Sequence, residues 1–122
     1  MYKLEELEAW KKAREFRKEM SLVAKSFPAE EKYRLTDQLI RASRSIAANI
    51  AEGFGRFHHQ ENIQYCRTAR GSLFECKEHM ICAFDENLIK KENLDTFETQ
   101  FDVLLKILNG YIAYLKRAKQ TQ

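Results

Sequence analysis

The sequence predicts an all-α protein, an antiparallel up-down-up-down four-helix bundle. The chain has 122 residues but only four glycines and one proline, too few for the frequent turns of an all-β fold. Apolar residues recur at alternating spacings of three and four in four segments, and short polar links separate these segments. We therefore expect a single domain over residues 1–122, with helices at about 5–27, 36–53, 59–86 and 94–118.

The first predicted helix, residues 5–27, has an apolar stripe surrounded by Lys, Arg and Glu. The stripe consists of Ala9, Ala13, Phe16, Met20, Val23 and Phe27. Pro28 ends the helix, because proline disfavours helical geometry in the residue before it.

The second predicted helix, residues 36–53, begins at a candidate N-cap and ends at two glycines. Thr36 has the hydroxyl that can cap a first turn. Gly53 and Gly55 can adopt the left-handed conformation that ends many helices. The apolar face between these signals consists of Leu39, Ala42, Ile46 and Ile50.

The third and fourth predicted helices also have regular apolar stripes. In residues 59–86 the stripe is Cys66, Ala69, Leu73, Cys76, Met80 and Ala83. In residues 94–118 it is Leu94, Phe97, Phe101, Leu104, Leu108, Tyr111 and Leu115, and Asn93 is the candidate N-cap. The mean spacing of 3.5 residues is typical of helices that pack with a shallow left-handed crossing.

Several apolar residues remain after each helix has buried one stripe. They are Leu22, Phe54, Phe57, Tyr65, Phe74, Ile81 and Phe84. Either a wide core absorbs them, or some form an outer patch of the kind that marks a protein interface. We favour the outer patch, and therefore self-association.

A polar stripe on the second helix faces a matching run on the third. It combines side chains that can hydrogen-bond with small residues that permit close approach of two helices. The predicted packing or subunit-contact network is Arg41, Ser45, Asn49, Glu52, Gly53, Arg56, Gly71, Ser72 and Glu75. We expect either an ion pair of Arg41 with Glu75, or one of Glu52 with a neighbouring arginine. His79, one turn after Glu75, is expected at the helix interface.

Four stretches of the chain carry a family resemblance. They are Leu7-x-x-Trp10, Phe27-Pro28-x-x-Glu31-x-Tyr33-x-Leu35, Gln38-x-x-Arg41-Ala42-x-x-Ser45-Ile46-x-x-Asn49-Ile50-Ala51-Glu52-Gly53 and Ala69-x-Gly71-Ser72-x-x-Glu75. They resemble the bacterial four-helix-bundle proteins encoded by intervening sequences of 23S rRNA genes, the S23 ribosomal protein family. The resemblance extends over about residues 4–116.

This resemblance implies a homopentamer. A related fold is that of the accessory proteins of diversity-generating retroelements, in which a basic pentamer contacts nucleic acid. The resemblance therefore also permits RNA or DNA as a partner. Neither a membrane nor a small-molecule substrate is predicted as a partner.

The candidate nucleic-acid-binding residues are basic and lie in the first and fourth predicted helices. They are Lys11, Lys12, Arg14, Arg17, Lys18, Lys116, Arg117 and Lys119. These two helices are expected to be neighbours, so their basic residues can join on one surface. The alternative is an ordinary solvated face, with Glu15 paired to Lys11 or Lys18. The formal net charge is only +3, with −2 in residues 58–88.

No catalytic, metal or cofactor site is expected. Cys66, Cys76 and Cys82 lack the paired spacing of zinc ligands, and we interpret them as reduced core residues. A di-iron bundle needs Glu-x-x-His, whereas Glu75 and His79 are four positions apart. A nucleophilic pair of Cys66 with His59 has no obvious oxyanion hole.

The expected compartment is the cytoplasm. The first residues include Glu5, Glu6 and Glu8 where a secretory signal needs an apolar core. No apolar stretch approaches the 18 residues of a membrane-spanning helix.

Overall fold

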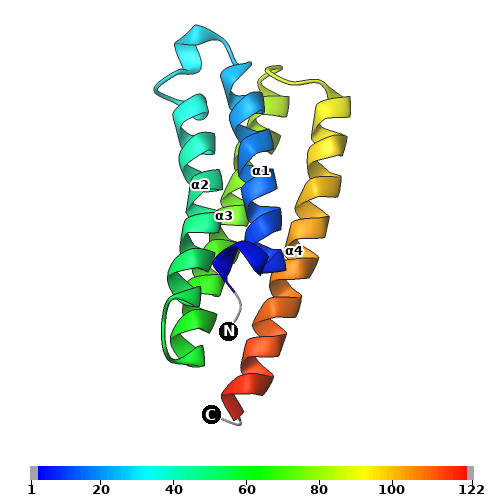
Figure 1. Cartoon of the computed structure of the whole chain (residues 1–122). Coiled ribbons are helices and arrows are strands. Elements are labelled where there is room, and N and C mark those ends of the chain that lie inside the picture. Colours follow the sequence, from blue (N-terminus) through cyan, green and yellow to red (C-terminus); the bar gives the residue numbers. More distant parts are fainter. Residues whose placement is uncertain (1–2, 121–122) are drawn as a thin grey trace.

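The computed structural model describes residues 3–120, which form four α-helices and two 3₁₀ turns. The helices are α1 (Glu8–Lys25), α2 (Leu35–Phe54), α3 (His59–Asp85) and α4 (Lys91–Gln120), and the turns are Leu4–Glu6 and Ala29–Glu31. Successive helices run in opposite directions, and both ends of the chain lie at the same end of the bundle (Figure 1). Residues 3–120 contain no strand. The predicted all-α, four-helix fold is confirmed.

The core lies along the axis of the bundle, where the four apolar stripes meet. Ala13, Leu39, Leu73 and Leu108 come from the four helices in turn, and each is 0% exposed. The predicted stripes are buried with few exceptions: Val23, Leu94 and Tyr111 are only half-buried. In α4 the neighbouring Ile112 is buried instead of Tyr111.

The first helix is shorter than predicted at both ends. Leu7 is extended (φ −74°, ψ 118°), so the Leu4–Glu6 turn is separate from α1, which begins at Glu8. This break places the Leu7 side chain in the core, at 6% exposure. At the other end Ser26 Oγ donates to the Val23 carbonyl at 2.6 Å, and α1 stops at Lys25. Phe27 is buried from non-helical backbone, as the following proline requires.

The start and the end of α2 differ from the predicted signals. Thr36 is not the N-cap: it lies inside the helix, and its Oγ1 donates to the Ala24 carbonyl of α1 at 3.3 Å. Instead, Glu31 Oε1 accepts the Leu35 N–H at 3.3 Å. Neither Gly53 nor Gly55 has a positive φ, so the left-handed termination predicted there is wrong.

The left-handed residue is found in the α3–α4 loop, at Asn87 (φ 62°). The Leu88 N–H bonds to the Ala83 carbonyl at 2.8 Å and the Asn87 N–H to the Phe84 carbonyl at 3.1 Å, which is a Schellman ending.

The predicted N-cap role of Asn93 is also wrong. α4 begins at Lys91, and Asn93 Oδ1 reaches back to accept the Lys90 N–H at 3.0 Å.

The four interhelical seams are not packed equally. The contact between α2 and α3 is the most extensive, and that between α1 and α4 is much the least. Along the α1–α4 seam runs a groove of about 350 Å³. We call it the α1–α4 groove; its lining is Lys12, Glu15, Phe16, Glu19, Thr99, Gln100, Val103 and Leu104.

Candidate functional site

The structure brings part of the predicted polar network together at the α2–α3 seam. Ser45 Oγ and Ser72 Oγ are 2.9 Å apart, which links the two helices. Asn49 Nδ2 donates to Ser45 Oγ at 2.9 Å and to the Ser45 carbonyl at 2.8 Å. These three half-buried side chains satisfy one another, and they fix the register of α2 against α3.

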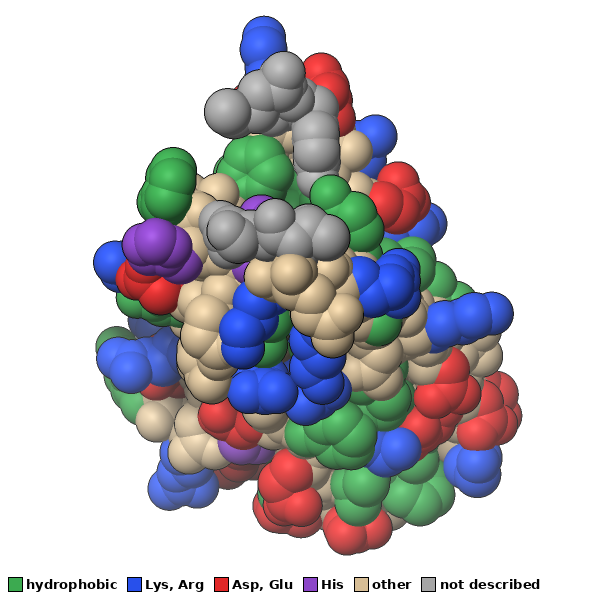
Figure 2. Space-filling view, turned by 90° about the horizontal axis from the view of Figure 1, so that it is seen from below, with side chains coloured by type: hydrophobic (Ala, Val, Ile, Leu, Met, Phe, Trp, Pro, Cys, Tyr) green, Lys and Arg blue, Asp and Glu red, His purple; other side chains and the backbone are tan. Residues whose placement is uncertain are grey.

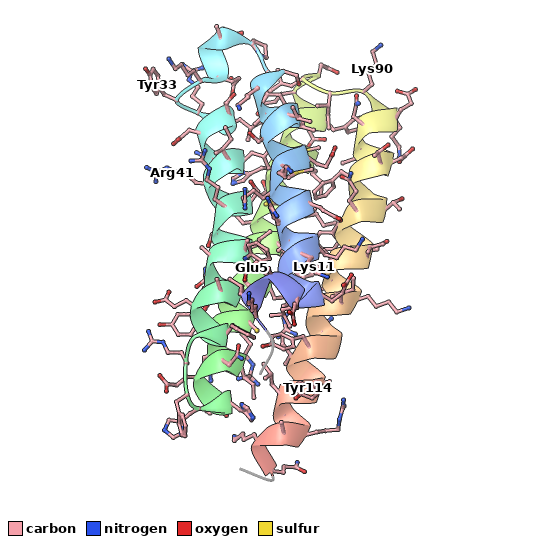
Figure 3. The ribbon with its side chains drawn as sticks, viewed as in Figure 1. Glu5, Lys11, Tyr33, Arg41, Lys90 and Tyr114 are labelled. Atoms are coloured by element: carbon pink, nitrogen blue, oxygen red, sulfur yellow. The ribbon has the colours of Figure 1, made fainter. Side chains whose placement is uncertain are left out.

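Arg41 and Glu75 do not meet, so the first predicted ion pair is wrong. Arg41 is 79% exposed and points away from the bundle (Figure 3), and its Nε lies 3.3 Å from Asp37 Oδ2 on the same helix. Glu75 instead binds His79 on α3, with Nε2 and Oε2 3.0 Å apart. The His79 side chain is only 12% exposed, which agrees with its expected place at a helix interface.

The alternative ion pair, Glu52 with a neighbouring arginine, is present. Arg56 Nη2 lies 3.4 Å from Glu52 Oε1, and Arg56 Nη1 lies 3.6 Å from Glu61 Oε2. The guanidinium also donates to Tyr65 Oη at 2.6 Å and lies over the Tyr65 ring, 5.0 Å from its centroid. Arg56 therefore holds the end of α2 against the first turns of α3. The prediction of the network did not include Tyr65.

The two glycines of the predicted network have opposite surroundings. Gly53 is buried, and a Cβ there would lie 2.6 Å from Asn62 Oδ1 and 2.8 Å from Tyr65 Cβ. α2 and α3 thus approach closely at this point, and a side chain does not fit. Gly71 is exposed, with nothing within 4 Å of a Cβ, so it does not take part in close packing within the bundle, and its predicted alternative role in a subunit contact stays a prediction.

Asn62 is a polar core residue that the sequence reasoning missed. It is 6% exposed; its Nδ2 donates to Tyr111 Oη on α4 at 2.9 Å, and its Oδ1 accepts from Cys66 Sγ at 3.5 Å. Asn62 lies four residues before Cys66, in register with the apolar stripe of α3. A polar residue at an apolar position was the signal that could have revealed it.

The basic residues of α1 separate into paired and unpaired groups. Lys12 Nζ pairs with Glu15 at 3.3 Å, so Glu15 takes neither of its two predicted partners. Arg14 lies over the Trp10 ring, 5.7 Å from its centroid, and Lys11 is exposed. Arg17 and Lys18 line a groove of about 310 Å³ with residues of α2. We call it the α1–α2 groove; its lining is Arg17, Lys18, Ser21, Leu22, Ile40, Ser43 and Arg44.

The basic residues at the end of α4 line a second groove, of about 270 Å³, together with α3. This α3–α4 groove is lined by Gln60, Ile63, Arg67, Lys116, Lys119 and Gln120. Lys119 Nζ donates to Gln60 Oε1 at 2.5 Å, and Arg117 is exposed. Figure 2 shows Lys and Arg side chains gathered at this end of the bundle.

The predicted basic residues therefore do not share one groove: Arg17 and Lys18 line the α1–α2 groove, and Lys116 and Lys119 line the α3–α4 groove. Each groove gains an arginine that the basic runs of the sequence did not suggest, Arg44 in one and Arg67 in the other. Neither groove has an acidic residue in its lining. Both can attract an anionic group.

The cysteine thiols are held in their protonated form. Burial raises the pKa of Cys66 to about 12, and it raises the pKa of Cys76 to about 12 with a contribution from Glu75. A hydrogen bond to Glu86 raises the pKa of Cys82 to about 11. Residues 3–120 contain no group of three or more His, Cys, Asp or Glu side chains placed to hold a metal ion.

Within residues 3–120, no helix is both long enough and apolar enough to cross a membrane.

Comparison with known proteins places this arrangement in a family. A solved structure from Bacteroides thetaiotaomicron, described as a protein of unknown function from the S23 ribosomal protein family, is similar with a TM-score of 0.79. The two sequences are 21% identical, and the match covers 86% of this chain and 95% of the other. No curated protein matches the chain. The family model described as 23S rRNA-intervening sequence protein matches residues 5–110, most of the bundle, and the chain therefore belongs to that family.

Proposed function

We propose that this protein is a non-catalytic assembly module of the cytoplasm, a helical bundle that associates with copies of itself. The observation that carries this proposal is the apolar surface that the bundle leaves exposed. Of the seven residues expected outside the core, Leu22, Phe57, Phe74 and Ile81 are exposed, and Phe54, Tyr65 and Phe84 are half-buried. Phe57 is 81% exposed and Leu22 66%. Five copies is the number that the family resemblance favours.

The state of the thiols supports a non-catalytic role. A cysteine nucleophile reacts as the thiolate, and the raised pKa of each of the three thiols keeps that form scarce near neutral pH. At pH 8 we expect Cys82, with a pKa of about 11 rather than 9.0, to be alkylated roughly 100-fold more slowly in the native protein than in urea. Alkylation of the native protein at the rate seen in urea would contradict this part of the proposal.

Light scattering during gel filtration tests self-association directly. The full chain at micromolar concentration should elute with a mass that is a multiple of 14.4 kDa. Dilution should lower the mean mass if the contact is reversible. A mass of a single chain throughout the micromolar range would overturn the proposal.

A second candidate function is association with RNA or DNA, supported by the acid-free lining of the α3–α4 groove. Arg67, Lys116 and Lys119 form no ion pair within residues 3–120, so their charges are available to phosphate groups. Repetition of the groove in an oligomer would multiply the positive charge.

A salt series with two variants tests this candidate. Binding of duplex DNA and of structured RNA should weaken steeply between about 50 and 200 mM salt, as counterion release requires. Arg67→Glu with Lys116→Glu should abolish binding. The matched control, Lys90→Glu with Lys106→Glu, changes the net charge equally at exposed positions outside this groove and should retain most of the affinity. Equal loss in both variants would contradict a specific role for the groove.

A further inference from the structure

The outward side of α3 presents an acidic and apolar stripe. We call it the α3 stripe; its members are Phe74, Glu78, Ile81 and Asp85. Their spacings of four, three and four place them on one side of a helix. Phe74 is 49% exposed and Ile81 37%. Glu78 and Asp85 are exposed and form no ion pair within residues 3–120.

The carboxylates of the α3 stripe contribute to the raised pKa of the neighbouring Cys82 thiol. Cys82 lies next to Ile81, and its pKa is raised chiefly by the hydrogen bond to Glu86, then by burial and the charge of Glu86, with the smallest contributions from Glu78 and Asp85. Residues 58–88 carry a net charge of −2 in a chain whose total is +3. The α3 stripe therefore presents apolar side chains beside uncompensated carboxylates.

The α1–α2 groove has the complementary character. Arg17, Lys18 and Arg44 line it with no carboxylate among the lining residues, and none of the three forms an ion pair in the part of the chain that the structure describes. Leu22, 66% exposed, and Ile40 add apolar surface between the cations. A free phosphate would neutralise the charges but leave Leu22 in water. A protein surface with both acids and apolar groups can neutralise the cations of the groove and bury its apolar side chains.

The α3 stripe cannot reach the α1–α2 groove of its own chain. The groove lies between α1 and α2, whereas the stripe lies on the α4 side of α3, where the Phe74 ring meets Phe101 edge-on at 5.1 Å. α3 stands behind α1 in the bundle (Figure 1). A second copy of the chain has both the acids and the apolar residues that the groove lacks.

We propose that the α3 stripe of one copy docks into the α1–α2 groove of the next. Phe74 and Ile81 contact Leu22 and Ile40, and the carboxylates of the stripe face the cations of the groove. This inference rests on the self-association proposed above, and it adds the two surfaces that meet. Because the surfaces differ, the contact is head-to-tail, and repetition generates a ring when the rotation closes and a filament when it does not.

Charge reversal on each surface provides the test. The groove variant is Lys18→Glu with Arg44→Glu, and the stripe variant is Glu78→Lys with Asp85→Lys. All four side chains are exposed and make no hydrogen bond within residues 3–120, so both variants should fold with the helical circular dichroism of the wild type. In light scattering each variant alone should fall to a single-chain mass of 14.4 kDa, because like charges now meet at every contact.

An equimolar mixture of the two variants is the decisive sample. In an alternating arrangement each altered surface meets its opposite charge on the other variant, so the mixture should regain a mass of at least two chains, even though a ring with an odd number of copies cannot alternate throughout. Neither general destabilisation nor a contact elsewhere predicts this recovery. The matched controls are Lys90→Glu with Lys106→Glu, and Glu5→Lys with Glu92→Lys, exposed pairs outside both surfaces that should assemble as the wild type does.

The outcomes separate this inference from the proposed function. A wild-type chain that is itself monomeric overturns both. A wild type that assembles while both variants also assemble overturns the docking of stripe into groove and leaves self-association standing. Monomeric variants that do not recover on mixing also contradict the head-to-tail contact.

Discussion

The α2–α3 seam and the α1–α4 seam show two ways in which amphipathic helices can lie side by side. At the first, Gly53 has no side chain and so lets the two helices approach closely. Ser45 Oγ and Ser72 Oγ, 2.9 Å apart, form a hydrogen bond between the helices. At the second, contact is sparser: the Phe16 and Phe97 rings meet with centroids 5.9 Å apart, but a groove of about 350 Å³ remains, lined by charged and polar residues as well as by Phe16 and Leu104. Both pairs of helices have regular apolar stripes. The difference therefore comes from the small and hydrogen-bonding residues that flank the stripes.

The largest expected effect is at the point of closest approach. Gly53→Ala places a Cβ 2.8 Å from Tyr65 Cβ, a backbone-anchored atom that cannot move aside without a shift of α3. We expect a loss of about 2 kcal/mol in the free energy of unfolding, in the range of overpacked cores. Urea unfolding followed by circular dichroism measures it.

Gly71→Ala is the matched control for this substitution. It adds the same methyl group to an exposed helical glycine with open space around it, so it should stabilise by about 0.5–1 kcal/mol through helix propensity. If the two substitutions changed stability in the same direction, the close approach at Gly53 would not be what determines its identity.

The next largest change in the free energy of unfolding is expected at the hydrogen bond between Ser45 and Ser72. Ser45→Ala and Ser72→Ala each remove one partner of the bond between the helices, and each should cost about 1 kcal/mol. A double-mutant cycle should give a coupling of about 0.5 kcal/mol or more, as expected for residues in direct contact. Additive losses would show that the bond does not link the two helices energetically.

A smaller effect is expected where the seam is open. Val103→Ile adds one methylene group beside the α1–α4 groove, where Val103 is 45% exposed and space remains. The free energy of unfolding should change by less than about 0.5 kcal/mol, as for most surface substitutions. A loss similar to that of Gly53→Ala would mean that the two seams are equally tight in solution.

The smallest effect is expected for the ion pair that does not form. Arg41→Ala and Glu75→Ala each remove an exposed charge whose partner lies one turn away on its own helix. Each should change the free energy of unfolding by less than about 0.5 kcal/mol. Losses of several kcal/mol from both substitutions that fail to add in the double variant would restore the predicted pair of Arg41 with Glu75.

The predictions from sequence succeeded where a local pattern was sufficient. The apolar stripes were assigned correctly except at half-buried positions such as Tyr111, because the spacing of apolar residues depends only on the helical period. Helix ends were less accurate. The break at Leu7 and the left-handed turn at Asn87 depend on tertiary burial and on backbone conformation, and neither follows from the stripe.

The candidate site was only partly predictable for a related reason. Ser45 and Asn49 were identified from one face of the second helix and Ser72 from a matching run on the third, and the structure brings them together. The same reasoning placed Arg41 opposite Glu75, because a stripe defines a face only to within the reach of a long side chain. Arg44 and Arg67 were not predicted as members of a basic surface, because each lines a groove together with basic residues of another helix.

Taken by itself, the sequence determined four helices, their order and the side that each turns inward. These are properties of segments, set by periodic apolar residues and by the scarcity of glycine and proline. Tertiary structure decided which seams close, which basic residues share a groove and which glycine is essential to packing. Those outcomes depend on the rotation and offset of one helix against another, and this geometry arises only when all four helices pack around the same core.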